Sequence, residues 1–321
     1  MTEKLTARVD ILVATHNLEG RAFEYLSQSV ADNTKKAYKA DWEHFTNWCQ
    51  ERGFQSMPAS SRTVALYLTH MAETGFKTST MQRRVSAISR IHQVRELPSP
   101  THTQLFKSTW SGIRRAKGTI QVGKEPALVA DIQAMVRGLP ATLTGTRDRA
   151  LILLGFAGAF RRSELVSLNV EDLTITRDGI VVLLRRSKTD QEGEGRKVGI
   201  PYGSYPDTCP VRTVQAWLEA SEINAGPIFR GINRHGQMAE TRMCDHTVAR
   251  IVKRSVARLG MESADYAGHS LRAGLATSAA AAGKSERSIM AQTGHTNPTM
   301  VRKYIREGSL FRDNAAAALG L

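Results

Sequence analysis

The sequence predicts a mainly α-helical protein that contains a small β-hairpin sheet and consists of two domains. Three observations lead to this fold class. Apolar residues recur at helical spacing from about residue 18 to residue 117 and again after residue 210. Residues 179–188 and 195–201 have the composition of two strands joined by a polar turn. Residues 118–129 combine Gly, Lys and Pro without helical periodicity, which is typical of a linker.

The first domain, residues 18–117, is expected to hold four or five helices. Capping side chains predict three helix starts: Asn33 or Thr34, Ser60 or Ser61, and Thr78 or Ser79. Helical spacing in the third of these separates an inward set from a basic set. The inward set is Met81, Val85, Ile88 and His92, and the basic set is Arg83, Arg84 and Arg90. An outward basic stripe suits a helix that lies along DNA, and a merely solvated face is the alternative interpretation.

The second domain, residues 130–306, is expected to mix helices with the hairpin. Helices around residues 128–138 and 147–158 come before the hairpin. Five more helical patterns follow it, at residues 211–220, 246–260, 270–283, 285–294 and 299–307. Residues 1–17 and 307–321 are expected to be tails, and apolar residues in the second tail predict a short helix.

The charge balance favours nucleic acid as the partner. The chain has 44 Lys and Arg against 30 Asp and Glu, a net charge of +14, and basic side chains that neutralise phosphates release condensed counterions. Three dispersed cysteines indicate neither a disulfide framework nor a thiolate metal site. No apolar run is long enough for a membrane span or a secretory signal. We therefore expect no membrane association and a cytoplasmic, nucleoid-associated protein of a bacterium or a phage.

The second domain also carries an ordered set of polar residues: Arg161, Glu164, Lys188, His269, Arg272, His295 and Tyr304. This set resembles that of the tyrosine recombinase or phage integrase family, which includes the Cre, Xer and lambda integrase types. Members have R-x-x-E, a hairpin Lys, H-x-x-R, a His or Trp, and a Tyr nine residues later, in this order. The resemblance covers residues 155–306 by motif and the first half only by its general helical pattern. Ala159 stands where many members have Gly, and we expect only a slight effect on the turn.

The resemblance implies a helical core-binding (SAM-like) domain followed by an α+β catalytic domain. The activity it implies is that of a site-specific recombinase or integrase, which cleaves and rejoins DNA through a 3′-phosphotyrosyl intermediate. The partner is then double-stranded DNA with a specific recombination site. If the tail 307–321 docks on a neighbouring protomer, as in the family, the assembly is a homotetramer on two duplexes. Docking within its own subunit is the alternative.

Phosphoryl-transfer chemistry explains why these residue types belong together. Attack on a phosphodiester adds negative charge to the non-bridging oxygens, which the forked guanidiniums of Arg161 and Arg272 can neutralise. His295 can add a donor. His269 can act as another donor or as the general base for the phenol of Tyr304, and the sequence leaves this open.

Other roles in the set depend on the nucleophile and the leaving group. The basic neighbours of Tyr304, namely Arg272, Arg302, Lys303 and Arg306, favour its phenolate if they point inward. By resemblance Lys188 is the general acid for the departing 5′ oxygen, and Glu164 would orient Arg161. No metal or other cofactor is expected, because P-loop, H-E-x-x-H and clustered acidic patterns are all missing from the sequence. Candidate DNA contacts are Lys36, Arg83, Arg84, Arg90, Arg162 and Arg302.

Two rival functions share part of this pattern. Residues 279–305 resemble a helix-turn-helix, so a non-catalytic DNA-binding protein is one alternative. Such a protein has no need for Lys188 on a hairpin or for Arg161. A type IB topoisomerase or a telomere resolvase, which uses nearly the same chemical groups, is the other.

Overall fold

The computed structural model describes residues 32–119, 123–187, 190 and 194–309. The chain divides into two compact units, Met1–Val122 and Gly123–Leu321, and each unit is described by itself. The expected N-terminal tail and Lys188 lie outside the described residues, as does the second tail from residue 310 onward.

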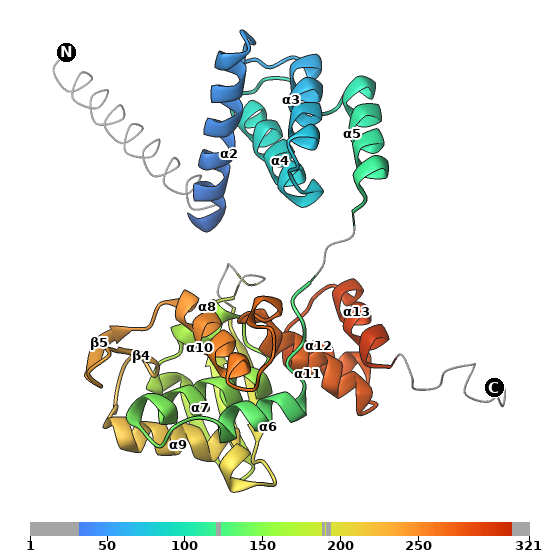
Figure 1. Ribbon diagram of the computed structural model, residues 1–321. Helices are drawn as coiled ribbons and strands as arrows, with labels where there is room; N and C mark the ends of the chain where they lie inside the picture. Colours follow the sequence, from blue (N-terminus) through green and yellow to red (C-terminus); the bar gives the residue numbers. More distant parts are fainter. Residues whose placement is uncertain (1–31, 120–122, 188–189, 191–193, 310–321) are drawn as a thin grey trace, which may run out of the picture. The chain divides into compact units, whose positions relative to one another are not determined.

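The first unit contains four described helices (Figure 1): α2 (Asp32–Glu51), α3 (Ser61–Glu73), α4 (Thr78–Val94) and α5 (Gln104–Lys117). Ser60 caps α3 by accepting a hydrogen bond from the Thr63 amide at 3.0 Å. The core of the unit is aromatic and aliphatic, with Phe45, Tyr67, Leu68, Met71, Met81 and Ile88 all buried. The predicted inward set of α4 is confirmed, because all four of its residues are buried.

Arg84 corrects the predicted basic stripe of α4. It is only 9% exposed, whereas Arg83 and Arg90 are exposed. Its guanidinium pairs with buried Asp41 at 3.6 Å, donates to Tyr67 Oη at 3.2 Å and lies over the Phe76 ring. The expectation that Arg84 faces outward is therefore wrong. Position 84 shares a helix face with residues 81 and 88, and the carboxylate of Asp41 compensates the buried charge.

The second unit is built around helices α6 (Val129–Arg137), α7 (Leu143–Ala157), α8 (Arg162–Ser167), α9 (Pro210–Ser221), α10 (Asp245–Ala257), α11 (His269–Ala281), α12 (Glu286–Thr293) and α13 (Pro298–Gly308). Short 3-10 turns lie at Val170–Asp172, Pro206–Thr208 and Ser263–Asp265. Buried residues of α7 meet Trp217 of α9 and Ile251 of α10 in one core.

Two antiparallel sheets complete this unit. One has the order β1 (Leu173–Thr176), β2 (Gly179–Leu184) and β3 (Arg196–Pro201), and the other pairs β4 (Arg230–Ile232) with β5 (Met238–Arg242). In the first sheet Leu184 lies opposite Arg196 and Ile180 opposite Ile200. The hairpin of β2 and β3 was predicted. The sequence analysis missed β1, β4 and β5, whose few residues give too short a pattern.

A separate small core holds the last three helices together. Ala273, Ala276 and Ala280 of α11 contact Ile289 of α12 and Val301 and Tyr304 of α13. The small side chains let the helices approach closely. At Gly308 of α13, an added Cβ would overlap the Thr277 carbonyl oxygen of α11. This close packing sets the position of Tyr304 against α11.

Candidate active site

Glu164 holds Arg161 at both its backbone and its side chain. Arg161 lies at the N-cap of α8. One carboxylate oxygen of Glu164 accepts from Arg161 Nη1 at 2.5 Å, and the other accepts from the Arg161 amide at 2.9 Å. Glu164 is 3% exposed, and its charge compensates a guanidinium that remains 19% exposed. Among the residues that the structure describes, Glu164 contacts only Nη1 of the Arg161 guanidinium, so the other donors of the fork can bind a ligand.

The turn before Arg161 presents a carbonyl to Arg272. Ala159 has φ +50°, a left-handed conformation that costs an alanine about 1–2 kcal/mol and a glycine almost nothing. The turn expected at this position therefore forms without glycine. The Ala159 carbonyl accepts from Arg272 Nη1 at 2.7 Å, and Arg272 is 1% exposed.

His295 is held by a chain of hydrogen bonds at the end of α12. Arg272 Nη2 donates to His295 Nε2 at 3.2 Å. The other ring nitrogen, Nδ1, donates to Thr293 Oγ1 at 2.7 Å, and the Thr293 hydroxyl donates to the Ile289 carbonyl at 2.7 Å. Since Nε2 accepts, this arrangement fits a neutral imidazole that carries its proton on Nδ1.

Tyr304 meets His269 directly. The hydroxyl oxygen of Tyr304 lies 2.9 Å from His269 Nε2, and Tyr304 is 7% exposed. His269 opens α11, and Arg272 follows three residues later on the same face of the helix. The packing of α13 on α11 therefore brings the phenol to the imidazole within one chain.

Burial and the arginines keep both histidines neutral in the free protein at neutral pH. Burial, with Arg272 and Arg161 next in importance, lowers the pKa of His269. The same causes lower the pKa of His295 to about 4. Burial also lowers the pKa of Arg272 to about 10, which leaves its guanidinium charged at neutral pH. The site therefore combines fixed cations with neutral imidazoles.

Of the four basic neighbours predicted for Tyr304, only Arg272 of α11 points inward, and the three on α13 do not. Arg302, Lys303 and Arg306 are exposed. Arg302 pairs with Glu286 at 2.9 Å, and Lys303 pairs with Glu307 at 3.8 Å. Burial raises the pKa of Tyr304, and Arg272 offsets this only in part. The condition for a phenolate favoured by these neighbours is not met, so the phenol needs a base.

The structure brings together five of the predicted catalytic residues and the supporting Glu164. The five are Arg161, His269, Arg272, His295 and Tyr304. Lys36 and Arg90 lie in the first unit and are exposed. Arg162 lies next to the site, where its side chain packs against Gly268 and pairs with Asp245 at 3.8 Å. Lys188 lies outside the described residues. Ser187 and Asp190, which flank it, exchange backbone hydrogen bonds at 3.1 and 3.2 Å.

Sequence analysis missed Thr293 and Arg196. Thr293 fixes the ring of His295, as described above. Arg196, the first residue of β3, influences the pKa of both His295 and Arg272 through its charge. A basic residue at the start of a strand carries no special pattern, so the sequence offered no signal for it.

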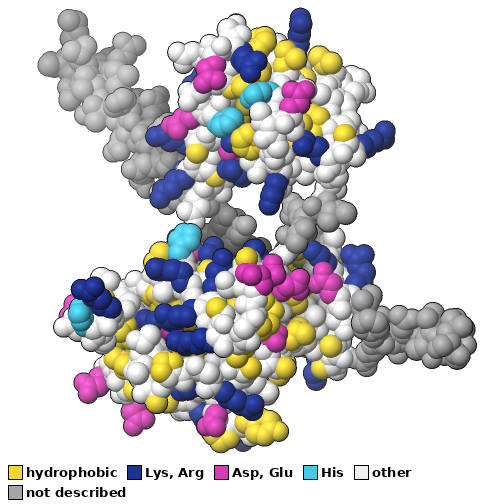
Figure 2. Space-filling model, in the orientation of Figure 1, with side chains coloured by type: hydrophobic (Ala, Val, Ile, Leu, Met, Phe, Trp, Pro, Cys, Tyr) yellow, Lys and Arg dark blue, Asp and Glu magenta, His cyan; other side chains and the backbone are white. Residues whose placement is uncertain are grey.

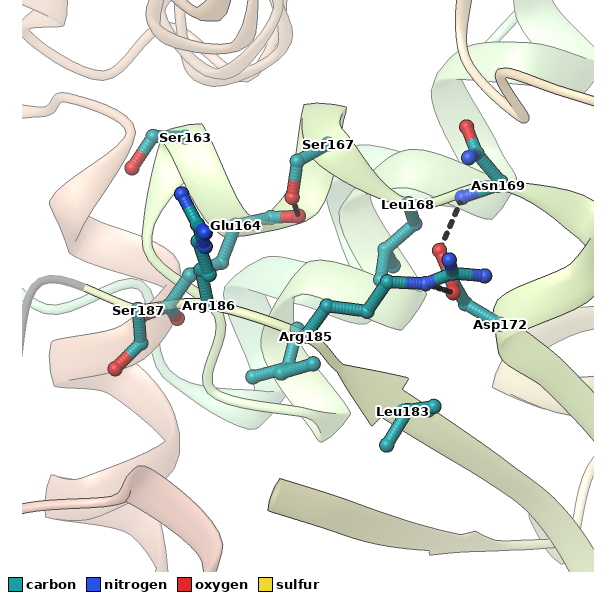
Figure 3. A pocket seen from close by; sticks show the side chains of 11 residues that line it. Ser163, Glu164, Ser167, Leu168, Asn169, Asp172, Leu183, Arg185, Arg186 and Ser187 are labelled. Carbon is teal, nitrogen blue, oxygen red and sulfur yellow. Dashed lines mark hydrogen bonds and ion pairs between the residues drawn. The ribbon is translucent and has the colours of Figure 1, made fainter. Parts of the chain in front are cut away.

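A pocket of about 460 Å³ lies beside the site. Figure 3 shows Ser163, Glu164 and Ser167 of α8 around it, with Arg186 beside Glu164 and Arg185 extending toward Asp172. Arg185 Nε pairs with Asp172 at 2.6 Å. No group of three or more His, Cys, Asp or Glu side chains that could hold a metal ion occurs among the residues that the structure describes.

Among the residues that the structure describes, no helix is long and apolar enough to span a membrane.

Two family models match the chain. The model of the phage integrase family matches residues 129–309, and that of the phage integrase N-terminal SAM-like domain matches residues 22–96.

Curated relatives and solved structures agree with these matches. An integrase/recombinase XerD homologue of Selenomonas ruminantium is 43% identical over 92% of this chain and 87% of its own length. The tyrosine recombinase XerD of Rhizobium meliloti is 25% identical over 86% of both chains. The fold is similar to that of the Tn1549 transposon integrase in complex with transposon right end DNA, with a TM-score of 0.61 at 19% identity over 86% of this chain and 89% of that chain.

Proposed function

This chain belongs to the phage integrase family and is a site-specific tyrosine recombinase, an enzyme that breaks and rejoins DNA, and we propose that Tyr304 is its nucleophile. The observation that carries the proposal is the 2.9 Å contact between Tyr304 Oη and His269 Nε2. Arg272 donates to His295, and Arg161 and Tyr304 both lie near enough to influence the pKa of Arg272. A phenol, a neutral imidazole and two guanidiniums are the groups that phosphoryl transfer to tyrosine requires.

His269 is the general base in this proposal. Its lowered pKa keeps the ring neutral at neutral pH, so Nε2 can accept the phenolic proton. The Tyr304 oxygen then bonds to phosphorus, and the bond from phosphorus to the 5′ oxygen breaks. The products are a 3′-phosphotyrosine and a 5′ hydroxyl. The reverse reaction rejoins a strand, because the covalent link preserves the energy of the broken bond.

Arg161 and Arg272 stabilise the negative charge that develops on the non-bridging oxygens of the phosphate. Glu164 occupies one end of the Arg161 fork and fixes its direction, so Glu164 is a positioning residue. In the free protein His295 has cationic neighbours, and an anionic phosphate in the site would add a negatively charged one. The phosphate thereby raises the pKa of His295 and favours the form that donates from Nε2.

Lys188 is assigned as the general acid on the strength of the family motif. It would protonate the departing 5′ oxygen, which is a poor leaving group without a proton. In the sequence Lys188 falls between β2 and β3, and its described neighbours Ser187 and Asp190 pair with each other. This position in the chain supports the assignment.

The proposed substrate is double-stranded DNA with a specific site. Residues 18–117 would bind the core of that site and residues 130–306 would cleave it, and the first range includes the whole match to the SAM-like domain model. Lys36, Arg83 and Arg90 remain proposed contacts because they are exposed. Arg302 is proposed only as a weaker contact, since Glu286 already neutralises it.

A further basic surface supports contact with the DNA backbone. A recess of about 580 Å³ between the β4–β5 hairpin and α10 is lined by five arginines: Arg147, Arg234, Arg242, Arg250 and Arg254. None of its described lining residues is acidic, but Asp148 behind it pairs with Arg147 and Arg254 at 2.7 and 2.6 Å. Arg234, Arg242 and Arg250 are therefore the proposed phosphate contacts. Figure 2 shows Lys and Arg side chains gathered on the second unit around this hairpin and α10. Guanidiniums in such an arrangement favour phosphate oxygens.

The active assembly is proposed to be a homotetramer on two duplexes, joined by the tail from residue 307 onward. Action on DNA further suggests a cytoplasmic, nucleoid-associated protein. The helix-turn-helix and topoisomerase alternatives are not favoured, because the named relatives are recombinases.

Covalent capture tests the nucleophile. The protein would be incubated with nicked duplexes of random core sequence, and DNA that stays attached after denaturation would be sequenced. We expect one preferred site and a phosphotyrosine at Tyr304. Tyr304→Phe should abolish capture yet keep its affinity for the selected duplex. Capture by the Phe variant would refute the assignment of the nucleophile.

A further inference from the structure

Arg196 connects β3 to the end of α12. Its Nη1 donates to the carbonyls of Ala291 and Gln292, both at 3.3 Å. These carbonyls belong to the last turn of α12, where a helix has no backbone partners for them and where its dipole favours a cation. The strand and the helix end are thereby joined by one side chain from a position about 95 residues away in sequence.

Gly294, the residue before His295, packs on the same guanidinium. Gly294 ends α12 with φ +65°. A Cβ at this position would lie 2.7 Å from both Cζ and Nε of Arg196. The turn that presents His295 therefore requires glycine for two reasons: its backbone is left-handed, and Arg196 occupies the space beside it.

Gln292 extends this connection to the segment before Arg161. Its side-chain Nε2 donates to the Ala157 carbonyl at 2.7 Å and to the Gly199 carbonyl of β3 at 3.3 Å. Ala157 ends α7, and the chain continues from there through the turn at Ala159 to Arg161. Three segments of the active site thus meet at the end of α12.

Burial of the Arg196 guanidinium is energetically unfavourable. Burial lowers the pKa of Arg196, and the nearby Arg161 lowers it further, while Glu164 acts in the opposite direction. Its Nη2 is fully buried and has no hydrogen-bond partner among the described residues. A buried donor without a partner costs about 1–3 kcal/mol. A side chain that only filled the space would avoid this cost.

We propose that Arg196 is a positioning residue that fixes the His295 turn against the β2–β3 hairpin and so sets His295 beside Arg272. The proposal rests on the proposed function, because it assigns His295 a task in the reaction. Arg196 acts through Gly294 and the α12 carbonyls and makes no contact with the scissile phosphate in this role.

Cleavage by point variants gives the first test. Single-turnover cleavage of the captured duplex, nicked and at saturating concentration, should fall by about 10- to 100-fold in Arg196→Ala, because a catalytic group displaced by about an ångström loses this much. Affinity for the duplex should change by less than about threefold. Arg196→Lys should recover part of the rate, since one ammonium can still donate to the helix end. Lys197→Ala is the matched control, because Lys197 is exposed on the opposite face of the same strand.

A double-mutant cycle gives the second test, which does not depend on cleavage. Gly294→Ala should lower the melting temperature strongly in the parent protein, because the new methyl group meets Arg196. In the Arg196→Ala background the same change should cost clearly less, since only the backbone strain remains. If Arg196→Ala does not fold, Arg196→Met replaces it in the cleavage test, and Arg196→Val, whose side chain ends before the position of Nε, replaces it in the melting cycle.

The outcomes separate the two proposals. Equal cost of Gly294→Ala in both backgrounds, or wild-type cleavage by Arg196→Ala, would overturn the role of Arg196. Partial recovery by Lys together with a reduced cost supports it. A failure of the nucleophile assignment would appear instead as capture by Tyr304→Phe, and the melting cycle would be unaffected by that result.

Discussion

The neutral state of His295 predicts a specific dependence of stability on pH. Burial and the neighbouring arginines lower the pKa of His295 from 6.5 to about 4 in the folded protein. Between these two pH values His295 binds a proton in the unfolded chain but not in the folded protein. Stability that is present above pH 6.5 is therefore lost as the pH falls toward 4. Replacing His295 with Gln removes this titration and keeps a polar side chain of similar size.

The magnitude follows from the size of the shift. The full difference in pKa corresponds to at most about 3 kcal/mol. The ring is only partly shielded from solvent, so we expect about 1 kcal/mol between pH 7 and pH 5. The groups that face His295 are Arg272, Arg161, His269, Arg196 and Tyr304. Among these only His269 also titrates in this window, and its effect is common to the parent and the variant.

The assay is urea unfolding of the parent protein and of His295→Gln at pH 7 and pH 5. The parent should lose about 1 kcal/mol more than the variant between the two pH values. In thermal unfolding this difference corresponds to about 2–4 °C for a unit of this size. Identical pH dependence in the two proteins would refute the argument that His295 is held neutral by its surroundings.

Three more predictions follow from particular contacts. Glu164→Gln should destabilise the protein by about 2–3 kcal/mol in urea unfolding and slow cleavage of saturating DNA, because the paired guanidinium loses a charged acceptor; unchanged values in both assays would contradict this. Gly274→Ala should lower stability by about 1–3 kcal/mol, because its Cβ would overlap the Ala127 carbonyl, and a melting temperature equal to that of the parent would show that residue 127 does not lie there. Arg250→Ala should reduce the slope of log DNA affinity against log salt concentration by about 1. Arg177→Ala, a change at a 92% exposed side chain, is the control. Equal slopes for the two variants would show that the arginine recess does not contact DNA.

The free protein has its nucleophile and its candidate base already in contact. The raised pKa of Tyr304 and the lowered pKa of His269 keep the proton on the phenol. A bound phosphate gives the arginines and histidines of the site a negatively charged partner. We therefore expect that DNA binding, and not a change in the phenol alone, activates the site.

Local sequence signals determined the fold class and the start of α3, and they selected the candidate residues of the site. The caps predicted for the two neighbouring helices were wrong, because α2 already begins at Asp32 and Lys77 is the N-cap of α4. Capping residues such as Ser60 act within three residues of the helix that they begin, and the periodicity of α4 depends only on its own residues. The seven polar residues proposed for the site were identified by their resemblance to the family's ordered motif, and the chemistry of a phosphodiester explains why these residue types occur together. These signals are local or chemical, so a single sequence carries them.

Tertiary packing alone decided three other features. Arg84 turns inward because Asp41, on another helix, is buried opposite it. Tyr304 meets His269 because the small residues of α11 admit α13. Arg196 belongs to the site because the end of α12 lies against β3. Each of these contacts joins residues that are more than 30 positions apart in the chain, and helical or strand periodicity carries no information about partners at that distance. The free energy of such contacts exists only once both segments are packed, and for this reason the sequence by itself named the chemistry but not its geometry.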